Sequence, residues 1–307
     1  MNSLISFENV SRWYGEVIAL NDISINIPQG VTGLLGPNGA GKSTFLNLVT
    51  GRLNPSKGKV TVLGENPRNN YKLTRFYGFV PEQDAFYEKL TGFDFMTYMA
   101  QLHGFERKNA KRTVMEILER HNLIAHMNKP VAAYSKGMRQ RIKLAQALIH
   151  DPEIIYLDEP MNGMDPVGRA ETIELVKKLG AAGKTIIVSS HILHEVEAMT
   201  QQIILIHNGK ILAEGIVQEI RGLIDEYPHN VIIHTDRPRE LAAFLLDYED
   251  VIDINIDNKQ NRLKVQSKEP DKFYQNLVVT IVEKGFNVTY IDSPDDNLQS
   301  VFKYLVK

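Results

Sequence analysis

The sequence predicts an α/β fold for most of the chain, followed by a smaller α+β domain, and three patterns lead to this prediction. Residues 31–35 form an apolar segment that runs into a glycine-rich loop and then into a segment with helical spacing, residues 43–49. Residues 154–157 form a second, continuous apolar run, which is typical of a buried parallel strand. From about residue 230 the strand and helix patterns follow the order βαββαβ. This change predicts a boundary between two domains.

The composition fits a folded chain of 307 residues with one large domain and one small one. Hydrophobic residues make up 43%, so a substantial core is available, and the formal net charge of −2 argues against a basic surface for nucleic acid. The sequence has no cysteine, which excludes disulfides and thiolate metal sites.

The N-terminus lacks the basic region and apolar core of a signal peptide. No apolar run approaches the roughly 20 residues that a membrane-spanning helix needs. We therefore expect the chain to be soluble by itself, and we expect any membrane role to come through a partner.

The glycine-rich loop matches the phosphate-loop pattern GxxxxGK[ST]. It reads Gly36-Pro37-Asn38-Gly39-Ala40-Gly41-Lys42-Ser43-Thr44. Glycines let the backbone approach a triphosphate closely, so that successive amide N–H groups can bind its oxygens at the start of the next helix. The pattern predicts nucleotide binding through residues 38–44, with Lys42 on the β- and γ-phosphates and the Ser43 hydroxyl on Mg²⁺. An accidental glycine-rich turn is the alternative, which the order strand, loop, helix disfavours.

The apolar run 154–157 ends in two acids, Asp158 and Glu159. Ligands of α/β proteins bind at the carboxyl ends of the parallel strands. Asp158 is therefore a candidate ligand of Mg²⁺, directly or through water, and Glu159 could polarise a water molecule for attack on the γ-phosphate. A strand that ends in a solvated acidic turn is the alternative, and the preceding phosphate loop makes it the weaker one.

Residues 88–148 carry mostly helical spacing, and their Met and aromatic residues are typical of a core, so they predict a helical subdomain. Its last helix follows Ser135, a good N-terminal capping residue, and Gly137, which permits close approach of another backbone. Taken alone, this segment indicates only the start of a helix with a solvated basic face.

Together these motifs resemble those of the nucleotide-binding subunit of an ATP-binding cassette (ABC) transporter. The resemblance covers residues 4–222 and follows the family's order of motifs. It matches Tyr14, the phosphate loop, Gln83, the signature segment 134–138, Asp158, Glu159, the loop 161–165 and His191.

The signature segment departs from the family's usual sequence. Lys136 stands where the family has a glycine, and Met138 stands where it has a glutamine. Ser135 and Gly137 are retained. The variant resembles bacterial exporter-type (ABC-2-like) cassettes, whose membrane subunits are separate chains. Lys136 could add charge near the phosphates or face water, and we favour the second position.

The resemblance implies a role for each matched residue. Tyr14 would stack on adenine, with Trp13 as a rival and ordinary packing as the alternative. Gln83 would bridge Mg²⁺ and the attacking water, unless it is only a polar loop residue. Glu159 would be the catalytic base. His191 would bind the γ-phosphate, although a lone histidine is more often structural.

Further residues follow from the same resemblance. Ser135 and Gly137 would meet the γ-phosphate of an ATP held by a second copy of the chain, so that two copies are arranged head to tail. Asp165 would help the two copies communicate, and it could also cap the helix that begins at Pro166. His194 is expected on a helix surface.

The chain is expected to divide into an ABC ATPase domain, residues 1–225, and a C-terminal domain, residues 226–307. In the first domain, the P-loop NTPase core encloses the helical subdomain 88–148. Phe86 and Tyr87 lie close to Gln83 in the sequence, which indicates either a docking patch for a membrane subunit or packing of the subdomain.

The C-terminal domain is predicted to be ferredoxin-like. Strands are expected at 231–234, 251–256, 262–266 and 287–291, and helices at 239–248, 271–284 and 298–305. It contains no catalytic constellation, and a regulatory or dimer-stabilising role is our hypothesis.

The sequence thus predicts an ATPase that uses ATP and Mg²⁺, forms a homodimer and drives export through integral membrane permease subunits. It would lie at the cytoplasmic face of the inner (cell) membrane, attached through those subunits, and it would not bind nucleic acid. The alternative is a soluble, non-transport ABC ATPase acting on a macromolecular complex. A small-molecule kinase or a GTPase fits less well, because Asn208-Gly209-Lys210 lacks the aspartate of a guanine-reading motif.

Overall fold

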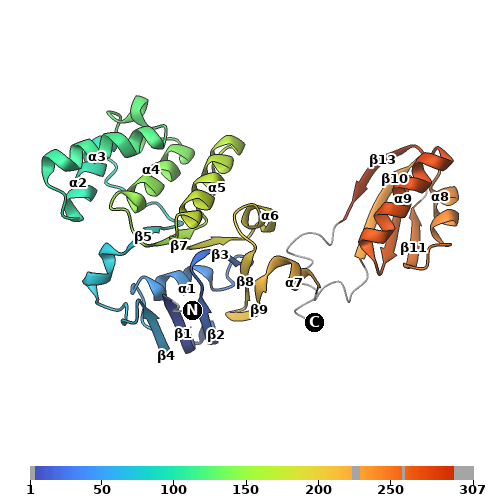
Figure 1. The fold of residues 1–307 in the computed structure, drawn as a ribbon, viewed down its shortest axis with the longest axis horizontal. Helices are drawn as coiled ribbons and strands as arrows, with labels where there is room; N and C mark the ends of the chain where they lie inside the picture. The colour runs from blue at the N-terminus through green and yellow to red at the C-terminus, as the bar shows by residue number, and fades with distance from the viewer. Residues whose placement is uncertain (1–3, 223–228, 258–259, 294–307) are drawn as a thin grey trace. The chain divides into compact units, whose positions relative to one another are not determined.

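The computed structural model describes residues 4–222, 229–257 and 260–293 (Figure 1). The chain divides into two compact units, Met1–Gly215 and Ile216–Lys307. The sequence analysis placed its boundary later, between residues 225 and 226. The segment between the two positions contains the helix α7, Val217–Gly222.

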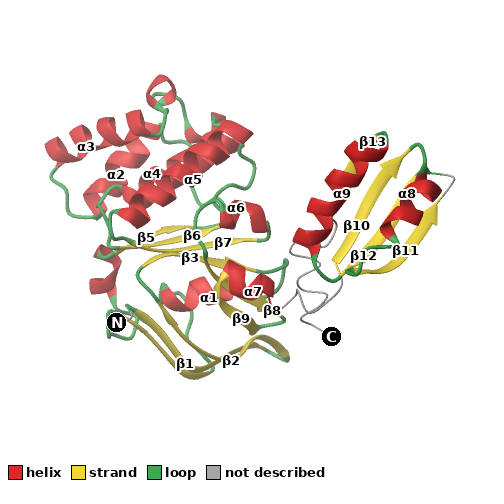
Figure 2. Cartoon of the chain, turned by 45° about the vertical axis from the view of Figure 1, so that its right-hand side comes forward, coloured by secondary structure: helices red, strands yellow, loops and turns green. Residues whose placement is uncertain are grey.

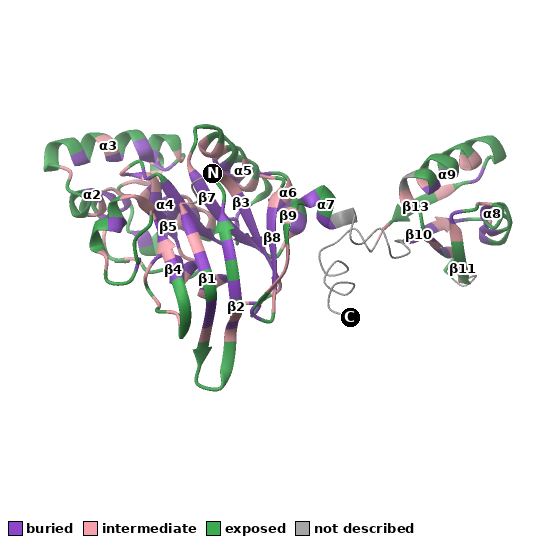
Figure 3. Ribbon diagram, turned by 60° about the horizontal axis from the view of Figure 1, so that its bottom comes forward, coloured by how far each residue is buried: buried purple, intermediate pink, exposed green. Residues whose placement is uncertain are grey.

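A six-stranded sheet forms the centre of the first unit, in the order β5-β6-β7-β3-β8-β9. Its strands are β5 Tyr77–Val80, β6 Ile154–Asp158, β7 Thr185–Ser190, β3 Gly30–Leu35, β8 Gln202–His207 and β9 Lys210–Ile216. The pairs β5–β6, β6–β7, β7–β3 and β3–β8 are parallel, so their carboxyl ends meet at one edge. Every residue of β6 and β7 is buried, as the continuous apolar runs predict (Figure 3).

The motif Asn208-Gly209 has a purely structural explanation. It joins β8 to β9, and both residues have positive φ, 46° and 74°. Such a pair is the preferred two-residue turn of a β-hairpin.

A three-stranded antiparallel sheet covers the outer side of the first unit, in the order β2-β1-β4. Its strands are β1 Ile5–Tyr14, β2 Val17–Ile27 and β4 Lys57–Val62. The strand pattern of the sequence covers residues 5–10. Pairing with β2 extends β1 as far as Tyr14, which lies opposite Val17 across a tight turn.

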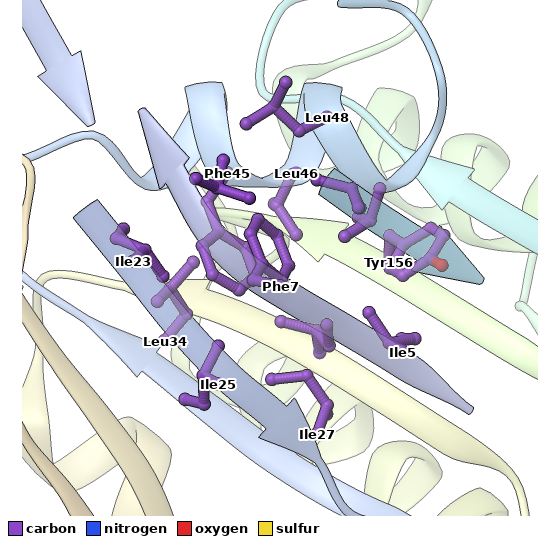
Figure 4. Close-up of a cluster of buried hydrophobic side chains, with 14 of the residues drawn as sticks. Ile5, Phe7, Ile23, Ile25, Ile27, Leu34, Phe45, Leu46, Leu48 and Tyr156 are labelled. Carbon is purple, nitrogen blue, oxygen red and sulfur yellow. The ribbon is translucent and has the colours of Figure 1, made fainter. Parts of the chain in front are cut away.

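The main core of this unit lies between the two sheets, where the helix α1, Lys42–Val49, fills the gap (Figure 4). The rings of Phe7 on β1 and Phe45 on α1 stack with centroids 4.2 Å apart. Tyr156 of the central sheet packs in the same cluster. This packing fixes the helix that follows the glycine-rich loop against the sheet that precedes it.

The opposite face of the central sheet is covered by helices (Figure 2). The helices of this side are α2 Gly92–Leu102, α3 Arg107–Arg120, α4 Lys136–Leu148, α5 Pro166–Ala181 and the short α6 Leu193–Glu197. The helical subdomain has its own core around Phe95, Met96 and Ile142. Leu144 on α4 and Val176 on α5 pack against the sheet.

Capping side chains define where these helices begin. Ser135 caps α4 by accepting a hydrogen bond from the Met138 amide, and Asp165 caps α5 by accepting one from the Gly168 amide at 2.8 Å. Pro166 follows Asp165 at the first position of α5. The capping functions expected for Ser135 and Asp165 are therefore confirmed.

The second unit has the predicted βαββαβ order. Its elements are β10 His229–Thr235, α8 Pro238–Leu245, β11 Val251–Asp257, β12 Arg262–Ser267, α9 Pro270–Lys284 and β13 Val288–Asp292. The sheet order is β11-β12-β10-β13 with antiparallel pairs, which is a ferredoxin-like topology. Gly285, with φ 65°, ends α9 as expected. The predicted helix 298–305 lies outside the described residues.

In the described part of the chain, no helix combines the length and the apolar character that crossing a bilayer requires.

Replacing Phe45 with alanine should strongly destabilise the first unit. Phe45 is fully buried and stacked on Phe7, so Phe45→Ala should lower the free energy of unfolding by about 3–5 kcal/mol. Urea unfolding followed by the fluorescence of Trp13, the single tryptophan of the chain, measures this. Tyr71→Ala is the control, because Tyr71 is 78% exposed and should change stability by less than about 0.5 kcal/mol. Equal effects of the two substitutions would contradict the packing described.

Candidate functional site

The glycine-rich loop between β3 and α1 has a shape that only glycine allows. Gly39 and Gly41 have positive φ, 82° and 112°. A Cβ atom on Gly41 would lie 2.6 Å from the Ala19 carbonyl oxygen, and one on Gly36 would lie 2.4 Å from the Ile206 carbonyl oxygen. At Gly36 and Gly41 the loop therefore passes too close to neighbouring backbone for any larger residue.

The loop opens into a surface hollow of about 410 Å³, which we call the phosphate hollow. Its lining residues are Ala19, Asn38, Gly39, Gly41, Lys42, Ser43, Thr44, Glu82 and Glu159. Gly41 occupies the capping position of α1 without a side-chain cap, so this helix end presents its amides to an anion. Ala40 was also predicted to bind nucleotide, but its side chain is buried in the main core. A contact to nucleotide from Ala40 is limited to its backbone.

Lys42 connects the loop to the acidic strand. Its Nζ donates to the Gly36 carbonyl oxygen at 2.7 Å and to the Pro37 carbonyl oxygen at 3.3 Å. The same Nζ lies 3.3 Å from Oε1 of Glu159, and both side chains are buried. A buried ammonium group needs several oxygen partners to offset its lost hydration, and Lys42 has them at the point where phosphate oxygens would bind.

Glu159 lies between two basic side chains. Nδ1 of His191 is 3.1 and 3.0 Å from its two carboxylate oxygens, and Lys42 contacts one of the two, Oε1. Glu159 has φ 48°, a left-handed conformation that is costly for a residue other than glycine. The structure thus brings together Lys42, Glu159 and His191, which the sequence predicted from three separate motifs.

Ser189 is a candidate site residue that the sequence analysis missed. Its hydroxyl donates to Oδ1 of Asp158 at 2.6 Å and accepts the Glu159 amide N–H at 3.0 Å. Ser189 is fully buried in β7, next to β6, and lies opposite Asp158 in the parallel register. The available signal was a pair of serines at the end of an otherwise apolar strand just before His191.

A second hollow, of about 510 Å³, adjoins Gln83, and we call it the Gln83 hollow. Its lining residues are Tyr14, Ser43, Asn47, Arg52, Leu53, Phe79, Pro81, Glu82, Gln83, Asp84, Ala85 and Asp158. It therefore collects every residue predicted to bind Mg²⁺, namely Ser43, Gln83 and Asp158. Tyr14 also lines it, whereas the rival aromatic Trp13 does not.

The donor chemistry of this hollow fits Mg²⁺ bound together with a nucleotide. Ser43, Gln83 and Asp158 offer a hydroxyl, an amide carbonyl and a carboxylate, all oxygen donors. Among the described residues, no cluster of three or more His, Asp or Glu forms a metal site of its own. Magnesium is usually held by one or two carboxylates plus substrate phosphates, so this donor set suits it only with phosphate oxygens present.

Tyr14 is 45% exposed, and the Arg12 guanidinium lies over its ring, 4.8 Å from the ring centroid. Arg12 also donates to the Asn54 carbonyl oxygen at 3.2 Å. A cation over one face of the ring leaves an exposed aromatic surface suited to stacking. The structure thus places Tyr14 where an aromatic ligand ring could stack.

The signature residues line a third hollow, of about 300 Å³, which we call the signature hollow. Its lining residues are Ser135, Lys136, Gly137, Met138, Arg141, Gly163, Met164, Asp165 and Gly168. No residue lines both this hollow and the phosphate hollow. Around the Cβ position of Gly137 only the Gly163 carbonyl oxygen comes as close as 4.0 Å, so Gly137 is open to a ligand.

Lys136 takes the position favoured in the sequence analysis and makes an additional contact that was not expected. Its side chain is exposed, as favoured, but it also lies against Gly163, and its Nζ donates to Oδ1 of Asn162 at 3.1 Å. Lys136 therefore joins the signature segment to the loop 161–165 within one chain.

Phe86 and Tyr87 are adjacent in the sequence but differ in burial. Phe86 packs into the core of the helical subdomain, edge-on to Phe95 at 5.4 Å, so subdomain packing is the correct alternative for Phe86. Tyr87 is 68% exposed. His194 is exposed on α6, as expected.

The known proteins that this chain resembles include parts of ABC transporters. The sequence model of the family described as "ABC transporter" matches residues 20–162. An uncharacterized ABC transporter ATP-binding protein of Nostoc sp. is 41% identical over 69% of this chain, which is 64% of its own length. The bacitracin transport ATP-binding protein BcrA of Bacillus licheniformis is 31% identical over 100% of this chain and 98% of its own length. Among solved structures, the dimeric structure of MJ0796, a bacterial ABC transporter cassette, has a TM-score of 0.64 and 27% identity over 69% of this chain and 98% of that chain.

Removing the Ser189 hydroxyl should destabilise the acidic strand end. Ser189→Ala leaves the Glu159 amide and Asp158 without a buried partner, so the free energy of unfolding should fall by about 1–3 kcal/mol in urea titrations. Thr185→Val is a matched control on the same strand. Thr185 is equally buried, but its hydroxyl makes no hydrogen bond within the described residues. An equal loss in both variants would show that the Ser189 hydrogen bonds contribute nothing specific.

Proposed function

This chain belongs to the family of ABC transporter ATP-binding proteins, whose nucleotide-binding domains hydrolyse ATP, and we propose that it powers export of a substrate through separate membrane subunits. The observation that carries the proposal is the convergence of Lys42, Glu159 and His191 at the edge where Asp158 and Ser43 also lie. These groups suit the binding and hydrolysis of a nucleoside triphosphate.

In the proposed reaction, the amides of residues 38–44 and the Lys42 ammonium bind the phosphates of ATP. Mg²⁺, when bound beside Ser43, Gln83 and Asp158, would neutralise charge on the phosphate oxygens. Glu159 takes a proton from a water molecule that attacks the γ-phosphate, and ADP and inorganic phosphate result.

The contacts of Glu159 support its assignment as the base. Phosphate oxygens would compete with Glu159 for the Lys42 ammonium, and a carboxylate released from an ion pair accepts a proton more readily. His191 contacts both carboxylate oxygens, so it can orient Glu159 while its exposed edge faces the γ-phosphate. Tyr14 would stack on the adenine ring.

The separation of the signature hollow from the phosphate hollow supports a dimer. Ser135 and Gly137 line a different hollow of the same chain, so a second copy in head-to-tail orientation would bring them to the ATP held by the first copy. A two-fold axis between the copies repeats this contact at both sites, so the interface is isologous and closes at two copies. Closure on ATP and opening after hydrolysis would then drive the membrane subunits between states.

The export direction is supported by the relative named for bacitracin transport and by the signature variant with Lys136 and Met138. We further propose that the protein binds at the cytoplasmic face of the cell membrane through permease subunits. We assign residues 1–225 as the ATPase domain. Residues 226–307 would have a regulatory or dimer-stabilising role, because no catalytic constellation occurs in their sequence.

Copurification tests the transport assignment. A tagged full-length chain, expressed in its native host and extracted with mild detergent, should bring down a protein with several membrane-spanning segments. Candidate substrates should then raise the ATPase rate of that complex. Recovery of ribosomes or another soluble assembly in place of a membrane protein would favour the non-transport alternative.

Replacing Glu159 with glutamine should separate ATP binding from hydrolysis. Glu159→Gln keeps the shape but removes the base, so kcat should fall by about 10²–10⁴-fold while ATP still binds. The trapped ATP should also raise the fraction of dimer. Phosphate release measures the first effect, and size-exclusion chromatography with light scattering measures the second. A variant with normal turnover would remove Glu159 from the proposed role.

A further inference from the structure

Lys143 is a buried lysine that no motif of the sequence analysis included. It lies on α4, and its side chain is 3% exposed. Its Nζ donates to the Pro81 carbonyl oxygen at 3.0 Å and to the Glu82 carbonyl oxygen at 3.2 Å, and it lies 3.0 Å from Oδ1 of Asp84. A buried ammonium is tolerated only with such compensation. All of these acceptors flank one residue, Gln83.

Arg139 holds the same segment one helical turn earlier. Its Nη1 lies 3.4 Å from Oδ2 of Asp84 and 3.1 Å from Oε1 of Glu88. Residues four apart share one face of a helix, so Arg139 and Lys143 together present two cations to the segment. Asp84 contacts both cations: its Oδ1 lies near Lys143 and its Oδ2 lies near Arg139.

The segment around Gln83 has little regular structure of its own. Residues 81–89, between β5 and α2, form neither helix nor strand. The position of Gln83 in its hollow therefore depends on side-chain contacts, and the contacts from α4 are ionic and largely buried. The same helix carries Ser135 at its N-terminal cap. One rigid element thus holds both the signature residue and the neighbours of Gln83.

We propose that Lys143 is a positioning residue for Gln83, which fixes the Gln83 amide beside Ser43 and Asp158 and makes it follow any displacement of α4. The inference rests on the proposed function, in which Gln83 assists hydrolysis. A movement of the helical subdomain would carry Ser135 and Gln83 together, because Lys143 links α4 to both carbonyl groups that precede Gln83. The contact of Ser135 with the ATP of the second copy would then be coupled to the placement of the attacking water by Gln83.

The test compares Lys143→Met with Lys184→Met in the full-length chain. Lys184 is the control: its Nζ binds a carboxylate oxygen and one carbonyl oxygen, both of Asp151, at 2.7 and 3.2 Å, away from Gln83. Lys143→Met should lower kcat for ATP by about tenfold, the scale seen when outer contacts of a metal site are lost. The KM for ATP should stay within about twofold, and half-maximal rate should need more Mg²⁺. Lys184→Met should change none of these.

A double-variant cycle shows whether Lys143 acts through Gln83. If it does, Lys143→Met should have little further effect on kcat in a Gln83→Ala background, because the effects of a linked pair do not multiply. Multiplying losses, or an unchanged kcat in Lys143→Met, would overturn the inference and leave the proposed function intact. A Gln83→Ala variant with normal kcat would overturn the proposed role of Gln83 itself, and the inference with it.

Asp84→Asn provides a second variant in case Lys143→Met does not fold. Asp84 is partly exposed, so this change removes the negative charge beside Lys143 and one of the two acceptor oxygens without opening the core. It should lower kcat in the same direction and to a smaller degree, again with little effect in the Gln83→Ala background. Folding of each variant is checked by circular dichroism and Tm. A folded Asp84→Asn variant with unchanged kcat and Mg²⁺ dependence would count against the inference.

Discussion

The parallel pairing of β3, β7 and β6 is the constraint on which the candidate site depends. Its register sets Leu35 beside Ser190 and Ser189 beside Asp158, so three strand ends stop at the same level. Each strand continues directly into a functional segment: the phosphate loop, the Asp158-Glu159 pair and His191. Since side chains at the ends of parallel strands share one edge, segments far apart in the chain meet without any special loop. A shift of one strand by a single residue would turn Ser189 away from Asp158.

Charge compensation then determines how these strand ends are arranged. Lys42 and Glu159 are both buried, and breaking a buried ion pair from one side typically costs roughly 3–5 kcal/mol. Glu159 also adopts a left-handed backbone, a conformation that costs about 1–3 kcal/mol and persists only where its surroundings hold it. Its amide is held by Ser189, and its carbonyl oxygen accepts from the Asn162 amide at 3.1 Å. Groups of the chain itself therefore hold the carboxylate, as preorganised catalysis by the proposed base would require.

The same principle operates in the helical subdomain, away from the central sheet. Lys143 and Arg139 compensate the carboxylates and carbonyl groups of an irregular segment that could not hold its own position. At the N-terminal end of α4, Lys136 joins the signature segment to Asn162 in the loop after Glu159. Side chains of one helix, α4, thus contact both the segment around Gln83 and the loop 161–165. The C-terminal unit contains its own core and sheet, and it is assigned no part in this chemistry.

The sequence alone determined the features that depend on neighbours in the chain. The phosphate loop, the caps at Ser135 and Asp165, the glycine stop at Gly285 and the βαββαβ order all follow from local spacing and backbone geometry, which act over a few residues. Local patterns also identified the candidate site residues Lys42, Glu159 and His191. They could not show that these three side chains touch, because that contact depends on strand order and register.

Only the tertiary structure decided the long-range contacts. The hydrogen bonds of Ser189 join adjacent strands, the three acceptors of Lys143 lie about 60 residues earlier in the chain, and β1 reaches Tyr14 only because β2 pairs with it. Phe86 and Tyr87 are adjacent in sequence, yet one is packed and the other exposed. Residue type gives no account of such differences, since burial is set by which distant surface covers a residue. The sequence therefore specifies which chemical groups are available, and the fold specifies which of them meet.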